Sequence, residues 1–170
     1  GKCSGYSMMD ARDQSKLNTA LIAAAPVALA GALGNIATIP NIPIWYASLI
    51  RPPLTPPNWL FGPVWTLLYL LMAVAFYRVL RLDPTTPGRA RAIGVFLLQL
   101  TLNAAWSFAF FAAHSPPLGL LTILPMLALI VATILLFRPL DSVAAGCLAP
   151  YVVWVSFATY LNAGFWWLNH

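Results

Sequence analysis

Residues 51–69 read Arg51-Pro-Pro-Leu-Thr-Pro-Pro-Asn-Trp-Leu-Phe-Gly-Pro-Val-Trp-Thr-Leu-Leu-Tyr69, and they join a proline-rich loop directly to an apolar segment. The two Pro-Pro pairs fix φ and remove N–H donors, so residues 51–57 can form neither a regular helix nor a central strand. From residue 59 onward the largest side chains recur at i, i+4, i+7 and i+11, namely Trp65, Tyr69, Met72 and Phe76. This spacing places them on one helical face. The stretch therefore predicts a stiff lid that leads into an aromatic helix.

The composition excludes a soluble protein. Hydrophobic residues make up 61% of the 170 residues and charged residues 8%, whereas a soluble surface needs about a quarter charged residues. The net charge of +5 could indicate nucleic-acid binding, but the charges are sparse and lie at the ends of apolar runs, so they are read as determinants of membrane topology. Two cysteines are too few for a disulfide framework.

The apolar runs predict an all-α membrane protein, a bundle of five transmembrane helices. Each run is long enough to cross a hydrocarbon core of roughly 30 Å. Residues 1–16 are a polar leader, whose first seven residues are compatible with an expression tag, and residues 17–170 form the transmembrane domain. The predicted spans are residues 17–39, 58–80, 89–113, 118–137 and 143–168. In the first span, Gly31 and Gly34 form a small-residue face that another helix can approach closely.

Five spans place the two termini on opposite sides of the membrane. The side of the N-terminus collects eight of the nine basic residues, and the other side has only Arg51. By the positive-inside rule the N-terminus is expected in the cytoplasm, with the proline-rich loop and the C-terminus on the opposite side. The eight basic residues are Lys2, Arg12, Lys16, Arg78, Arg81, Arg89, Arg91 and Arg138.

The usual catalytic and metal-binding patterns are missing. The acids are confined to the leader and the turns, and His114 and His170 have no cysteine or carboxylate at ligand spacing, which argues against a metal site. Within the predicted spans the charged residues lie only at the ends, at Arg78, Arg89 and Arg91. An ion-coupled pump usually needs an ionisable group inside the membrane and is therefore disfavoured. No cofactor is expected to be required. The four acids are Asp10, Asp13, Asp83 and Asp141.

Aromatic and amide side chains share faces in the third and fifth spans. An amide in hydrocarbon needs a partner, so these amides are expected to point into the bundle. They could serve only as hydrogen bonds between helices, or they could join the indoles in a flat apolar slot for a large planar ligand. The two faces are Gln99, Asn103, Trp106 and Phe110, and Tyr151, Trp154, Ala158, Leu161 and Asn162.

Three blocks of sequence make the chain recognisable. They are Trp45-Tyr46-Ala47 with Arg51-Pro52, Pro56-Pro57-Asn58-Trp59 and Gly62-Pro63-Val64-Trp65; then Gln99-Leu100-x-Leu102-Asn103-x-x-Trp106; and then Pro150-Tyr151-x-x-Trp154-x-x-Phe157-Ala158-Thr159-x-Leu161-Asn162. With these blocks the chain resembles the TspO/MBR family, the tryptophan-rich sensory proteins and translocator proteins also known as peripheral-type benzodiazepine receptors. The resemblance covers nearly all of the chain after the leader.

The resemblance implies a five-helix bundle, commonly a homodimer, that binds porphyrins such as protoporphyrin IX and haem, and also sterols and benzodiazepine-type drugs. It implies a bacterial cell-envelope membrane, or the mitochondrial outer membrane in a eukaryote. Arg51 is the candidate to meet an anionic propionate. By position, the ligand-binding residues would be Trp45, Phe61, Trp65, Tyr69, Asn103, Trp106, Trp154, Ala158 and Leu161.

The leading hypothesis is a membrane receptor or sensor for tetrapyrroles, with a role in their transport or regulation. The alternative is an enzyme for light-dependent porphyrin degradation, because tryptophans that match Trp65 and Trp154 are implicated in that reaction in some bacterial relatives. A structural scaffold is a third possibility. The chain lacks the tyrosine and arginine of the vertebrate cholesterol motif after Asn162, and it has Leu54 and Thr122 where some members carry a tryptophan and an acid. High-affinity cholesterol recognition is therefore not expected.

Overall fold

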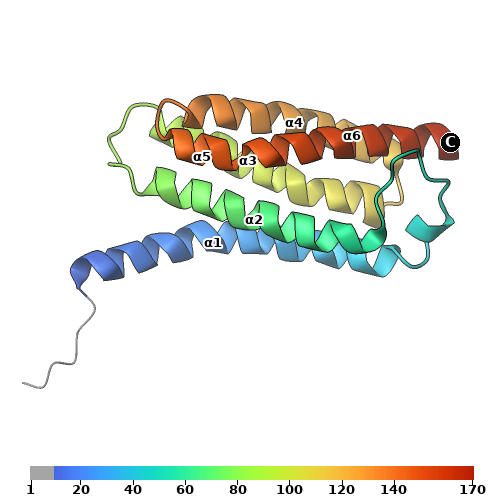
Figure 1. Ribbon diagram of the computed structural model, residues 1–170, viewed down its shortest axis with the longest axis horizontal. Helices are drawn as coiled ribbons and strands as arrows, with labels where there is room; N and C mark the ends of the chain where they lie inside the picture. Colours follow the sequence, from blue (N-terminus) through green and yellow to red (C-terminus); the bar gives the residue numbers. More distant parts are fainter. Residues whose placement is uncertain (1–9) are drawn as a thin grey trace, which may run out of the picture.

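The computed structural model describes residues 10–170 (Figure 1); the predicted tag at residues 1–7 lies outside this range. The described chain is all-helical, and within it five segments are long and apolar enough to cross a membrane. The prediction of a five-span helical bundle is thus confirmed. The elements are α1 (Ala11–Thr38), η1 (Ile39–Asn41), η2 (Tyr46–Ser48), α2 (Asn58–Leu80), α3 (Arg89–Ser107), η3 (Phe108–Ala112), α4 (Pro116–Phe137), α5 (Ser142–Cys147) and α6 (Ala149–Asn169).

Two helix boundaries differ from those predicted. Helix α1 begins at Ala11, six residues before the predicted span, because polar residues continue the helix past the apolar run; Gln14 Nε2 donates to Asn18 Oδ1 at 3.1 Å in this part. The last span consists of α5 and α6, which meet at Leu148. Pro150 lies at the second position of α6, and because proline has no N–H, it is favoured at a helix start.

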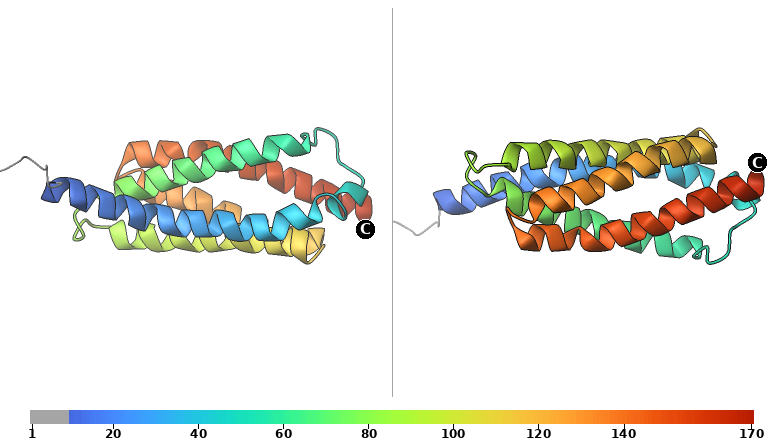
Figure 2. Two further views of the ribbon diagram at one scale, coloured as in Figure 1. Left: turned by 90° about the horizontal axis from the view of Figure 1, so that it is seen from below. Right: turned by 90° about the horizontal axis from the view of Figure 1, so that it is seen from above.

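The helices run side by side along the long axis of the bundle (Figures 1 and 2). In the half of the bundle where α1 begins, buried apolar side chains pack tightly together. Phe96 lies at the centre of this part, with ring centroids 4.6 Å from Phe76 and 5.9 Å from Phe137. Ala75 and Ala92 are fully buried beside these rings. The small side chains let the helices approach closely, so this half of the bundle is closed.

A lid, residues 39–57, connects α1 to α2 and is bound at both edges. At one edge Asn169 of α6 donates through Nδ2 to Ile50 O at 2.9 Å and accepts from Ile50 N at 2.8 Å. Tyr160 also donates to Pro53 O at 2.9 Å. Pro52 packs so closely on Gly164 that a Cβ there would lie 2.6 Å from the proline ring. Any larger residue at position 164 would therefore push the lid away from α6.

The other edge of the lid rests on the turn between η3 and α4. The Trp45 indole stacks on the His114 ring, with centroids 4.8 Å apart and an interplanar angle of 5°. His114 Nε2 lies 2.7 Å from Asn41 Oδ1, while Asn41 Nδ2 donates to Ala37 O. His114 adopts a positive φ of 52°, which costs energy for a residue with a side chain. These contacts hold it in that conformation.

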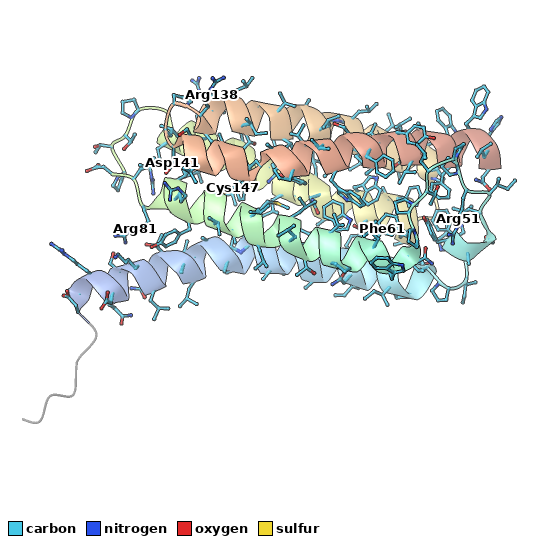
Figure 3. All side chains as sticks on the ribbon, in the orientation of Figure 1. Arg51, Phe61, Arg81, Arg138, Asp141 and Cys147 are labelled. Carbon is cyan, nitrogen blue, oxygen red and sulfur yellow. The ribbon has the colours of Figure 1, made fainter. Side chains whose placement is uncertain are left out.

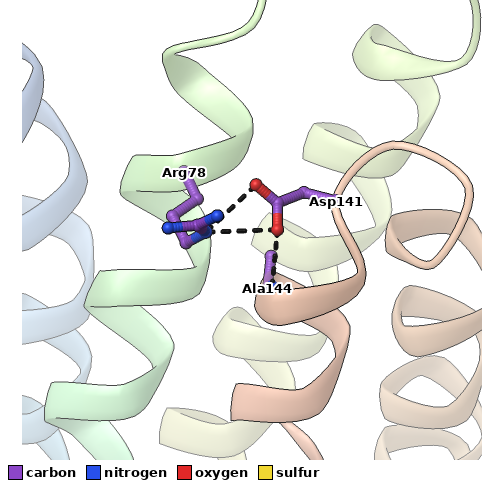
Figure 4. A network of polar contacts seen from close by, with 3 residues as sticks. All are labelled: Arg78, Asp141 and Ala144. Carbon is purple, nitrogen blue, oxygen red and sulfur yellow. Dashed lines mark hydrogen bonds and ion pairs between the residues drawn. The ribbon is translucent and has the colours of Figure 1, made fainter.

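Basic residues collect at the end of the bundle where the chain begins, as Arg81 and Arg138 show in Figure 3, and Arg51 lies at the other end. At the first end Arg78 Nε donates to both carboxylate oxygens of Asp141, at 3.0 and 3.1 Å (Figure 4). Asp141 also caps α5 by accepting from Ala144 N at 3.0 Å. Desolvation raises the pKa of this carboxyl, but the hydrogen bonds from Ala144 and Arg78 outweigh it and hold the pKa below its ordinary value.

Candidate ligand-binding cavity

A cavity of about 480 Å³ lies beneath the lid, in the half of the bundle where α1 ends. Residues of α1, α2, α3, η3 and α6 form its walls, and the lid contributes Ile39, Ile42 and Tyr46. Its volume falls within the range of about 300–1,000 Å³ that is typical of small-molecule sites. The bundle therefore has one tightly packed end, where α1 begins, and one end beneath the lid with room for a ligand.

The cavity brings together eight of the ten residues that the sequence predicted for the site. They come from three helices that are far apart in the chain, which confirms that the three aromatic and amide faces converge in the fold. Their contacts with a ligand stay a prediction. The eight are Phe61, Trp65, Tyr69, Asn103, Trp106, Trp154, Ala158 and Leu161.

The two other predicted residues lie beside the described lining. Trp45 packs edge-on against Phe110, which does line the cavity, with centroids 5.3 Å apart. The Arg51 guanidinium lies 5.3 Å from the centroid of the Tyr46 ring, and Tyr46 lines the cavity. Trp45 and Arg51 are thus one side chain removed from the cavity, and any effect on a ligand in this arrangement passes through Phe110 or Tyr46.

Tyr46 lines the cavity; it belongs to the block Trp45-Tyr46-Ala47 but was not among the ten predicted site residues. Its side chain is only 4% exposed, and its hydroxyl is buried without a hydrogen-bond partner among residues 10–170. Burial raises the pKa of this hydroxyl, and the charge of Arg51 partly offsets the rise. An unpaired buried hydroxyl is costly, so Tyr46 is ready to bind a polar atom of a ligand.

The contribution of α1 was also missed. Gly31, Gly34, Asn35 and Thr38 line the cavity, whereas the sequence indicated only that the two glycines contact another helix. They do that as well, because a Cβ at Gly31 would lie 3.4 Å from the Tyr69 ring. The signal that could have revealed this wall is their spacing of i, i+3, i+4 and i+7, which places small and polar side chains on one face.

A chain of buried hydrogen bonds runs from the cavity wall into the bundle. Tyr69 donates its hydroxyl to Asn103 Oδ1 at 2.8 Å, and Asn103 Nδ2 donates to the Tyr151 hydroxyl at 2.7 Å. Tyr151 in turn donates to Gln99 Oε1 at 2.7 Å. The amides therefore hold helices together, as one of the two interpretations predicted, and Asn103 forms part of the cavity wall at the same time.

The indoles of the cavity differ in their hydrogen bonding. Trp106 Nε1 donates to Asn162 Oδ1 at 2.9 Å, and Asn162 Nδ2 donates to Pro116 O at 2.7 Å. Trp154 Nε1 is buried and has no partner within the described chain. The Trp106 ring is thus fixed by a polar contact. The Trp154 ring is held by aromatic packing, with the Phe61 centroid 5.9 Å away.

None of the described residues that line the cavity carries a charge. Its walls offer flat aromatic surfaces, amides and hydroxyl groups, a combination suited to an apolar planar molecule with a few polar atoms at its edge. Such walls can orient and desolvate a ligand. They contain no carboxylate or imidazole for proton transfer.

Comparisons with known proteins agree with this architecture. Residues 22–168 match the TspO/MBR family. The chain is 41% identical over 118 residues to the tryptophan-rich protein TspO of Chlorobaculum tepidum, covering 69% of this chain and 75% of the relative. It is 37% identical over 140 residues to the protein of the same name from Archaeoglobus fulgidus, covering 82% and 89%. It is 36% identical over 127 residues to the human translocator protein, covering 74% and 75%. The chain is a multi-pass membrane protein that belongs to the TspO/MBR family.

Proposed function

We propose that the cavity binds a tetrapyrrole such as protoporphyrin IX or haem, and that the protein is a membrane receptor or sensor for this ligand. The observation that carries the proposal is the convergence of Trp65, Trp106 and Trp154 on one uncharged cavity of about 480 Å³. A planar conjugated ring stacks favourably on indole faces, and burial removes its apolar surface from water.

The polar groups of the cavity support recognition of the ligand's polar edge. The Tyr46 hydroxyl and the Trp154 indole N–H are donors without partners in the described chain, and a ligand oxygen could satisfy either after a small side-chain movement. The Arg51 guanidinium lies over the Tyr46 ring, 5.3 Å from its centroid. In this proposal Arg51 favours a propionate electrostatically, and Tyr46 makes the direct contact.

The test is a titration of the protein in nanodiscs with protoporphyrin IX, followed by tryptophan fluorescence. Each aromatic pair contributes about 0.5–1.5 kcal/mol beyond burial, so a Trp65→Ala/Trp154→Ala variant should bind roughly 5- to 150-fold more weakly. The matched control is Trp166→Ala/Trp167→Ala, which removes two indoles that are 45% and 76% exposed and should leave the affinity unchanged. Equal affinities for the two double variants would refute this site.

A second candidate function is light-dependent degradation of the bound porphyrin. It is favoured by a series of close rings: Trp65 lies 5.6 Å from Tyr69 and 6.4 Å from Tyr151 between centroids, a geometry that can support electron transfer between aromatic groups. Illuminated incubation with and without oxygen, scanned for loss of the Soret band and for a product band, tests this function. No turnover above that of the Trp65→Ala/Trp154→Ala variant would leave binding alone.

The proposal also covers the orientation of the protein in the membrane, its oligomeric state and its weaker ligands. We propose that the N-terminus faces the cytoplasm and the lid the opposite side, because the basic residues collect at the N-terminal end of the bundle. Labelling single cysteines placed at Arg91 and at Leu54 from either side of sealed vesicles tests this orientation. We also propose a homodimer, tested by light scattering of the purified protein, and sterols or benzodiazepine-type drugs as weaker ligands, tested by displacement of the porphyrin.

A further inference from the structure

The lid closes the cavity at the end of the bundle. Asn169 holds the backbone of Ile50 through two hydrogen bonds of 2.8 and 2.9 Å, and Tyr160 holds that of Pro53. The opposite edge is held by the stack of Trp45 on His114. A ligand that arrived from the water would have to break contacts at one edge or the other. The end of the bundle is therefore the guarded side of the cavity.

The side of the cavity between α1 and α2 is open. The two helices touch where Gly31 faces the Tyr69 ring, and from there they diverge toward the lid (Figure 2, left). Directly after α1, in η1, Ile39 lines the cavity and is 62% exposed; on α2, Trp59 lines it and is 72% exposed. A residue that is both exposed and part of the lining marks an opening. Asn35, Gly62 and Thr66 share both properties.

The wall formed by η3 and the outer turns of α6 is closed. Phe110, Leu161 and Phe165 line the cavity and are 3%, 5% and 2% exposed. The opening lies within the spans Ala11–Asn41 and Asn58–Leu80, and so at membrane depth. The hydroxyl of Thr66 donates to Gly62 O of its own helix at 2.8 Å, so this polar group already has its partner within α2. On α2 the edge of the opening therefore leaves no unpaired hydroxyl facing hydrocarbon.

We infer that ligands reach the cavity sideways from the bilayer, through a portal between α1 and α2 formed by Asn35, Ile39, Trp59, Gly62 and Thr66. The inference rests on the proposed function in that the cavity is taken to bind a ligand. It specifies the ligand class further: the molecule partitions into the membrane before it binds. Gly62 lines the cavity and a Cβ there would have no atom within 4 Å, so a large side chain can be introduced at this position to narrow the portal.

The test measures access to the cavity without using a porphyrin. The native cysteines are replaced by serine, and Ala158→Cys places a thiol on the cavity wall. The protein in nanodiscs is then labelled with pyrene maleimide, which dissolves in the bilayer, or with a sulfonated methanethiosulfonate, which stays in water. The pyrene reagent is expected to label the thiol and the sulfonated reagent to react far more slowly.

Narrowing the portal should slow the pyrene reagent. Gly62→Phe is expected to reduce its labelling rate about tenfold, equivalent to about 1.4 kcal/mol in the barrier. Thr66→Phe, one turn further along α2, provides a second narrowing variant. The matched control is Gly94→Phe, at another glycine with no atom within 4 Å of an added Cβ but outside the described lining; its rate should stay within about twofold of the parent.

Two results would overturn the portal: labelling that neither narrowing variant slows, or a sulfonated reagent that reacts as fast as the pyrene reagent. The proposed function fails separately, in the fluorescence titration. If protoporphyrin IX does not bind while Gly62→Phe slows labelling, the tetrapyrrole proposal is refuted and the portal stands.

Discussion

Tyr151→Phe tests the buried hydrogen-bond chain between α3 and α6. The change removes one oxygen and keeps the ring, which is 1% exposed. That oxygen accepts from Asn103 Nδ2 and donates to Gln99 Oε1, each at 2.7 Å. Gln99 Nε2 already lacks a partner within residues 10–170, so in the variant both polar atoms of this side chain would be unpaired.

The expected loss in the free energy of unfolding depends on whether values measured in soluble proteins or in membrane proteins apply. A buried polar group left unpaired in a soluble protein costs about 1–3 kcal/mol, so two such groups would cost about 2–6 kcal/mol. Hydrogen bonds between membrane helices average about 0.6 kcal/mol and reach about 1.7 kcal/mol, because the unfolded helices also find partners in the bilayer. The values for membrane helices apply to this bundle, so the loss of two hydrogen bonds should lower the free energy of unfolding by about 1–3 kcal/mol.

The assay is reversible unfolding in mixed micelles, followed by circular dichroism. Tyr160→Phe is the matched control, since it removes a single exposed bond to Pro53 O and should cost less than about 1 kcal/mol. Adding Gln99→Met to Tyr151→Phe should restore part of the stability, because an apolar side chain of similar shape leaves no unpaired amide. The reasoning is refuted if Tyr151→Phe costs no more than Tyr160→Phe, or if the double variant is less stable than Tyr151→Phe alone.

Three further predictions concern the ends of the helices. Asp141→Ala should destabilise the protein by about 1–2 kcal/mol through loss of the helix cap and of the ion pair with Arg78. Asp141→Asn should destabilise it by less, because the amide oxygen can still cap α5. Similar losses of stability in the two variants would contradict the capping role. Folding lowers the pKa of Asp141 below its ordinary value of 3.8. The carboxylate therefore contributes fully to the free energy of unfolding above pH 3.8, and this contribution is lost as the pH falls below that value. Unfolding measured as a function of pH would show the loss. His114→Ala should raise hydrogen exchange in residues 39–48 about fivefold, since losing the stack with Trp45 costs about 1 kcal/mol; unchanged exchange would mean that the stack does not hold the lid. Gly119→Ala places a Cβ 2.7 Å from an amide oxygen that is fixed in its own hydrogen bonds and should cost about 1–3 kcal/mol in thermal unfolding, whereas a stable variant would show that the two helices can separate there.

The spans and the three converging faces could be predicted because they depend on hydrophobic length and helical period alone. The start of α1 could not, since an apolar run marks the part of a helix within the membrane and carries no signal for its polar extension. Gly31 and Gly34 were predicted to contact a helix, and they also line the cavity. A glycine face looks the same in sequence whether another helix covers all of it or only part.

The lid shows a different limit. Trp45 and Tyr46 are adjacent in sequence, and only Tyr46 lines the cavity. Which of two neighbouring rings turns inward depends on the 3-10 turn Tyr46–Ser48 and on the stack of Trp45 with His114, a residue nearly 70 positions away. Helical periodicity does not extend into such a loop, and the contact that decides the outcome is tertiary.

The π-helical turn Phe108–Ala112 at the end of α3 has a consequence for how this sequence can change in length. A π turn holds one residue more than an α-helical turn, and here Phe110 and Phe111, adjacent in the chain, both line the cavity. Deleting one residue would restore regular α-helical bonding and rotate the following side chains by about 100°. The helix would lose nothing in regularity, yet one of the two rings would leave the cavity wall. Length in this turn is therefore under a stricter constraint than residue identity.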